Sequence, residues 1–167
     1  KITEKFLPRV LDNFARIIIS TRLEKKSETL NEWLKLTDKY KKYIDSDLLL
    51  LKMDIYSGKT PSYLSEEDLK NFTDEVKLKI FEEAKKEGIQ GFSGRKSLNV
   101  FNTFITKYGK NANLISMETV QEYFIPKDTE RDPMISESFI ESLVRLYDFN
   151  TLQEIKEAIY YFNKDQI

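Results

Sequence analysis

Apolar residues recur at three- and four-residue steps along almost the whole chain, and few residues interrupt this pattern. Only five glycines and four prolines occur among the 167 residues. The spacing describes one face of an α-helix, whereas a half-buried strand would alternate at every second residue. We therefore predict an all-α fold, a bundle of about seven or eight packed helices. The first of them should be central and largely buried, because only a narrow stripe of its surface is polar. The positions that recur at helical spacing in it are Phe6, Val10, Phe14, Ile17, Ile18 and Thr21.

Capping residues divide this pattern into separate helices. Thr29 followed by Glu32 is a capping box, and further N-caps are expected at Ser46, Ser65, Ser93, Ser116 and Ser136. We expect the helix that begins at Ser65 to continue as far as Gly88. Near the C-terminus, Asn150 should end one helix, and a second capping box at Thr151 should begin another.

The composition excludes several classes of function. The 27 basic and 28 acidic residues leave a net charge of −1, which argues against a general nucleic-acid-binding domain. The chain has no cysteine and no histidine, so disulfides, thiolate or histidine metal sites and Ser-His-Asp catalysis are all impossible. No apolar run is long enough to span a membrane.

The remaining polar motifs have ordinary structural explanations. The acid pairs Glu66–Glu67 and Glu82–Glu83 occupy adjacent helical positions that point in different directions, so we interpret them as solvated faces. Asp148–Asn150 is similar to the Asp-Phe-Gly motif of protein kinases, but we interpret it as an interhelix turn with a buried aromatic. The chain has no phosphate-binding P-loop of its own. We assign no catalytic and no metal-binding residue. At least one of the aromatic residues Tyr160–Phe162 should be exposed or covered by a region outside this chain, because three consecutive side chains cannot share one helix face.

The segment Gly91–Arg95 breaks a local rule. Gly88 ends one predicted helix and Ser93 opens the next, which places Arg95 in a first turn. Cations are disfavoured there because the helix N-terminus carries partial positive charge, but a bound phosphate would reverse that penalty. Arg95 is therefore a candidate phosphate-binding residue, with Gly91, Ser93 and Gly94 as its supporting turn. The alternative is that Arg95 points into water or pairs with a nearby glutamate.

Three stretches, Phe6–Arg16, Glu87–Ser97 and Ser142–Asp148, resemble the bacterial PrkA-type serine protein kinases, which carry an AAA+ ATPase module. The resemblance implies that residues 1–112 form a lid-like helical bundle and residues 113–167 a C-terminal helical extension packed on it. The chain begins without methionine, so we expect it to be a fragment, and the resemblance implies that the parent protein is bacterial and cytoplasmic. Its partner would be the ATPase core of the same full-length chain. Assembly into a homo-oligomer is a further possibility. ATP and Mg²⁺ would bind the full-length protein and not this fragment alone.

The resemblance also gives Arg95 a role. AAA+ lids commonly place a "sensor 2" arginine at the start of a lid helix, where it reaches the terminal phosphates of the nucleotide. The expected function is therefore that of a regulatory lid, which couples ATP binding to movement of a helical domain. The main alternative is a helical protein-interaction module with no nucleotide role. The protein substrate, and whether the parent is a true kinase or only an ATPase, do not follow from the sequence.

Overall fold

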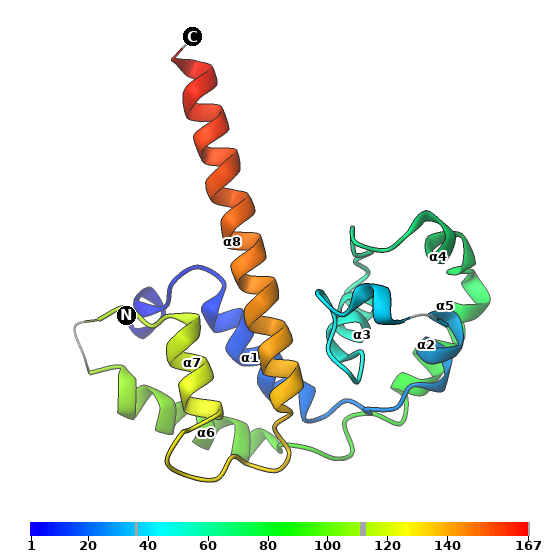
Figure 1. The fold of residues 1–167 in the computed structure, drawn as a ribbon. Helices are drawn as coiled ribbons and strands as arrows, with labels where there is room; N and C mark the ends of the chain where they lie inside the picture. Colours follow the sequence, from blue (N-terminus) through cyan, green and yellow to red (C-terminus); the bar gives the residue numbers. More distant parts are fainter. Residues whose placement is uncertain (36, 111–112, 167) are drawn as a thin grey trace.

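The computed structural model describes residues 1–35, 37–110 and 113–166, and over these residues it is entirely helical (Figure 1). The only strand-like pairing in this part of the chain is a single parallel bridge between Phe6 and Ile115. The predicted all-α class is confirmed. The described residues form eight α-helices: α1 Val10–Ser20, α2 Glu28–Trp33, α3 Leu49–Tyr56, α4 Glu66–Asn71, α5 Asp74–Ala84, α6 Gly94–Tyr108, α7 Met117–Phe124 and α8 Glu137–Asp165. Two short 3-10 helices, η1 (Ile2–Lys5) and η2 (Thr37–Tyr40), complete them.

Side-chain caps begin most of these helices. In each of six helices the N-cap oxygen accepts a hydrogen bond from the backbone N–H three residues later, which satisfies a group that the helix itself cannot bond. The six residues are Ser27, Ser65, Thr73, Ser93, Ser116 and Ser136. The predicted caps at Ser65, Ser93, Ser116 and Ser136 are therefore confirmed.

The first hydrophobic core lies among α1, α6, α7 and the first half of α8. Phe14 of α1 is at its centre, with ring centroids 5.0 Å from Phe104 of α6 and 5.1 Å from Phe124 of α7. Val10 and Ile17, one helical turn to either side, are fully buried. The first predicted helix is thus buried on its apolar face, although it begins only at Val10 because Arg9 has a left-handed backbone (φ 68°).

The second core lies among α2, η2, α3 and α5. Its fully buried members include Leu30 of α2, Leu51 of α3 and Ile80 of α5. Helix α3 belongs to both cores, since its Leu49 and Leu50 pack in the first one. A helix between two cores must be apolar on more than one side, and α3 accordingly joins the two halves of the molecule.

Four predicted helix boundaries are wrong. The capping box expected at Thr29 does not begin α2, because Ser27 is the N-cap and Thr29 lies within the helix. The helix expected from Ser65 to Gly88 is two helices, because the chain leaves the helix at Phe72 and Thr73 caps a new one. The break expected at Asn150 is absent, and α8 runs without interruption to Asp165. Ser46 does not cap α3. Instead the buried carboxylate of Asp45 accepts bonds from the N–H groups of Leu49 and Leu50, at 3.0 and 2.9 Å.

The C-terminal half of α8 rises away from the other helices (orange to red in Figure 1). Its first half is buried through Phe139, Ile140 and Leu143. Tyr160, Tyr161 and Phe162 are all more than half exposed. No helix in the described ranges has the length and apolar character needed to cross a membrane. The expected domain boundary at residue 112 lies outside the described residues.

Candidate functional site

The turn between α5 and α6 is held closely against the end of α1. Gly88 and Gly91 both have left-handed backbones, with φ of 82° and 91°. A Cβ atom at Gly91 would lie only 2.2 Å from the carbonyl oxygen of Thr21, so no larger residue fits there without a shift of the backbone. Ser93 then begins α6, its hydroxyl oxygen accepting a 3.1 Å bond from the N–H of Lys96. Gly91 and Ser93 thus form the turn that the sequence suggested, each for a distinct structural reason.

Arg22, just beyond the end of α1, fixes both ends of this turn. Its guanidinium donates a 2.6 Å bond to the carbonyl of Gly88 and a 2.9 Å bond to the carbonyl of Phe92. The backbone N–H of Gly88 donates in return to the carbonyl of Arg22, at 3.0 Å. Phe92 is 2% exposed and packs in the first core, and its N–H donates to the hydroxyl of Thr21. Sequence reasoning missed this role because Arg22 and Gly88 are far apart in the chain and carry no shared local pattern.

Arg95 lies in the first turn of α6 and is exposed. Within the described residues its guanidinium makes no hydrogen bond and no ion pair. The backbone N–H groups of Gly94 and Arg95 likewise have no acceptor there, as is usual at a helix N-terminus. The nearby-glutamate alternative for Arg95 is therefore not realised in this structure. The arrangement combines a free planar cation with free amides, which is suited to an anion.

The neighbouring cation, Lys96, is engaged in contacts of its own. Its Nζ lies 2.9 Å from the Oδ2 atom of Asp132 and 4.3 Å from the centroid of the Phe92 ring. Partial burial tends to raise the pKa of Asp132, but the bonds from Lys96 and from the N–H of Met134 outweigh it and hold that pKa below its usual value. Lys96 therefore ties α6 to the loop before α8, and Arg95 is the cation left available.

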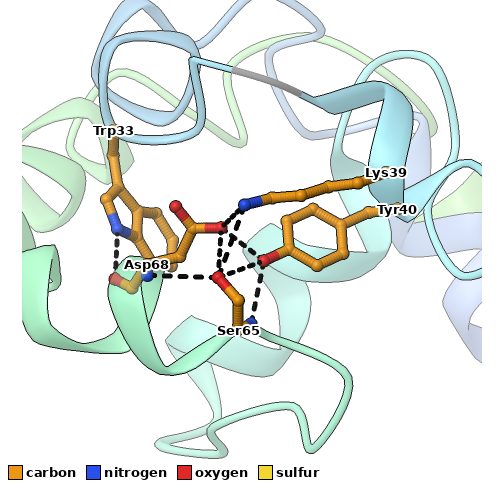
Figure 2. Close-up of polar contacts among 5 residues, drawn as sticks. All are labelled: Trp33, Lys39, Tyr40, Ser65 and Asp68. Carbon is orange, nitrogen blue, oxygen red and sulfur yellow. Dashed lines mark hydrogen bonds and ion pairs between the residues drawn. The ribbon is translucent and has the colours of Figure 1, made fainter.

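A second polar cluster lies in the other half of the molecule (Figure 2). The carboxylate of Asp68 accepts bonds from Lys39 (2.6 Å), from Tyr40 and from Ser65 (3.0 Å). Trp33 donates its indole N–H to the backbone carbonyl of Asp68 at 2.8 Å. The residues come from α2, η2 and α4, and no sequence motif connects them, so sequence reasoning did not identify this cluster.

The Figure 2 cluster is not arranged for nucleophilic catalysis, although Lys39 lies 3.4 Å from the Ser65 hydroxyl. A serine–lysine pair needs a neutral lysine as the base. Here the hydrogen bond to Asp68 raises the pKa of Lys39. The pKa of Asp68 is lowered, because its bonds from Lys39, Tyr40 and Ser65 outweigh the effect of burial. Both groups stay charged, Ser65 serves as a helix cap, and the cluster fixes α4 against η2.

Two expectations about other motifs need correction. Glu83, interpreted as part of a solvated face, instead accepts bonds from the hydroxyls of Ser27 (2.6 Å) and Thr29 (2.5 Å) and ties α5 to the start of α2. Phe149 does not lie in a turn with its ring buried. It lies within α8, its side chain is 46% exposed, and its nearest ring contact is Tyr43. The described residues contain no group of three or more His, Cys, Asp or Glu side chains that could hold a metal ion.

Comparison with known proteins identifies one family. The sequence model of the family described as the PrkA serine protein kinase C-terminal domain matches residues 50–167, which is more than half of the chain. The matched range begins within α3 and includes the α5–α6 turn and Arg95. Neither the curated proteins nor the solved structures give a match.

Proposed function

Because the chain belongs to the family of PrkA serine protein kinase C-terminal domains, we propose that it is the lid and helical extension of an ATP-dependent protein. Its partner is the ATPase core of the full-length protein, and that core binds ATP and Mg²⁺ in the cytoplasm. Assembly into a homo-oligomer is compatible with this proposal. In this proposal Arg95 reaches the terminal phosphates of the nucleotide, so that ATP binding and movement of the helical region are coupled.

One observation carries the proposal: Arg95 is an exposed, unpaired guanidinium on a rigidly held turn. Cations at a helix N-terminus are destabilised by the helix dipole, so an anion placed there removes an existing penalty. The planar fork matches two phosphate oxygens at once, whereas a lysine offers only a point charge. Since Phe92 is buried and Arg22 holds both ends of the turn, little backbone entropy remains to be lost when the phosphate binds.

The test is Arg95→Ala in the full-length protein, with ATP affinity and hydrolysis as readouts. Arginines that neutralise a transferring phosphoryl group contribute on the order of 10³–10⁵ in rate, and a lid arginine that also positions the lid should contribute less. Arg95→Lys should restore activity only in part. Lys96→Ala is the matched control for charge, because it removes a neighbouring cation that is already paired with Asp132. If Arg95→Ala leaves ATP affinity and turnover at the level of the unmodified protein, the nucleotide role is wrong.

The projecting part of α8 favours a second candidate, a helical interaction module with no nucleotide role. Leu152, Ile155 and Ile159 are each about half exposed and Phe162 is 64% exposed. Their spacing of three, four and three residues places them on one face. If Arg95 variants are unaffected in every nucleotide assay while Ile155→Ser with Ile159→Ser abolishes the biological activity of a folded protein, this second function should replace the first.

A further inference from the structure

Two segments of the chain cross side by side between the two halves of the molecule. The first follows α1 and leads to α2. The second follows α5 and leads to α6 (blue and green in Figure 1). The backbone bond between Gly88 and Arg22 joins the two crossings directly. The turn that presents Arg95 is thus not a free loop, because its position depends on the end of α1.

Arg22 bonds to both ends of the turn from a single side chain. Its fork contacts the carbonyls of Gly88 and Phe92, the two residues that bracket the turn. A guanidinium stays charged at every accessible pH and its donors have a fixed geometry, so the distance between these carbonyls is held constant. Phe92 is only three residues before Arg95, and Ser93 caps the helix between them.

A buried ion pair also fixes the same crossing. Lys52 of α3 is fully buried, and its Nζ lies 2.6 Å from the Oε1 atom of Glu87 and 2.7 Å from the carbonyl of Glu24. Glu24 belongs to the first crossing and Glu87 to the second, directly before Gly88. A buried charge is tolerated only when it is paired, so movement of either segment away from Lys52 is strongly opposed.

From this geometry we infer that Arg22 is the positioning residue for Arg95: it sets the place from which α6 starts, and so the reach of the Arg95 guanidinium toward a nucleotide phosphate. The inference rests on the proposed function of Arg95. Groups that act on phosphates must be held within a fraction of an ångström of their working position, and a displacement of about 1 Å can cost on the order of 100-fold in rate.

The experiment is a double-mutant cycle between Arg22→Ala and Arg95→Ala in the full-length protein, with ATP affinity and kcat measured for each variant. If Arg22 acts through Arg95, Arg22→Ala should weaken nucleotide binding or turnover by on the order of tenfold to 100-fold. In a protein that already carries Arg95→Ala, Arg22→Ala should then cause little further loss of ATP affinity or turnover. Arg22→Lys should restore only part of the loss. Thr21→Val, which removes the hydroxyl that accepts the Phe92 N–H, is a milder variant in case Arg22→Ala does not fold.

The cycle separates the possible results. A purely structural role would lower stability and leave the two effects on ATP affinity additive, which overturns the inference. The inference is also wrong if Arg95→Ala lowers ATP affinity or turnover while the two Arg22 variants and Thr21→Val leave both unchanged. In that case the proposed role of Arg95 stands without a role for Arg22. If Arg95→Ala itself has no effect, the proposed function fails and the inference falls with it. Asp68→Asn is the control for destabilisation elsewhere, and it should leave ATP affinity unchanged.

Discussion

Truncation of Phe14 to alanine should destabilise the protein more than any comparable change at its surface. Phe14 is 3% exposed, and its ring meets Phe101, Phe104 and Phe124 from α6 and α7 at centroid distances of 5.0–5.6 Å. Such a site cannot collapse without moving two helices, so the cost should be near the range for buried aromatics, about 3–5 kcal/mol. For a domain of this size, that loss corresponds to a Tm lower by about 6–20 °C.

Chemical denaturation measures this loss with two probes at once. Far-UV circular dichroism reports all helices, and the fluorescence of the single tryptophan, Trp33, reports the second core. Because α3 contributes Leu49 and Leu50 to the first core and Leu51 to the second, the two cores should unfold together. Phe14→Ala should therefore shift the Trp33 transition as much as the circular dichroism transition, although the mutation lies in the other core.

Phe149→Ala is the matched control, because the same atoms are removed from a side chain that is 46% exposed. It should cost less than about 1 kcal/mol. A loss below about 1 kcal/mol at Phe14 would refute the central position of α1. Two separate transitions, with only the circular dichroism signal shifted, would show instead that α3 does not couple the cores.

Three further predictions concern the turn, the Figure 2 cluster and the isolated chain. Gly91→Ala should lower the free energy of unfolding by about 1–3 kcal/mol, since it forces a strained backbone and a contact with Thr21; Gly94→Ala, whose Cβ meets nothing within 4 Å, should cost nothing when measured by the same denaturation. Asp68→Asn should destabilise most at neutral pH: the folded-state pKa of Asp68 is lowered, so its contribution is present above about pH 4 and is lost as the pH falls through the folded pKa. Equal destabilisation by Asp68→Asn at pH 7 and at pH 2.5 would contradict this. The isolated chain should hydrolyse no ATP and phosphorylate no protein in a sensitive radiolabel assay, because it lacks a P-loop; turnover abolished by mutating one of its own carboxylates would overturn that expectation.

The sequence by itself determined the features that depend on neighbours a few residues away. Helical periodicity, the serine caps and the glycines of the α5–α6 turn are short-range signals. The all-α class, the caps at Ser93 and Ser136, and the place of Arg95 in the first turn of a helix followed from them. The free state of Arg95 did not follow, because a nearby glutamate partner was equally compatible with the sequence.

Only the tertiary structure decided the rest. Arg22 and Phe92 are 70 residues apart, and Lys52 and Glu87 are 35 apart, so no local pattern could pair them. The same holds for Glu83, whose partners Ser27 and Thr29 lie at the start of another helix. At Asn150 and Thr151 a plausible capping box was overruled, because helix propensities differ by less than about 1 kcal/mol per residue and α8 simply continues. Local preferences of that size define where helices can form, whereas burial and long-range hydrogen bonds decide which of them join.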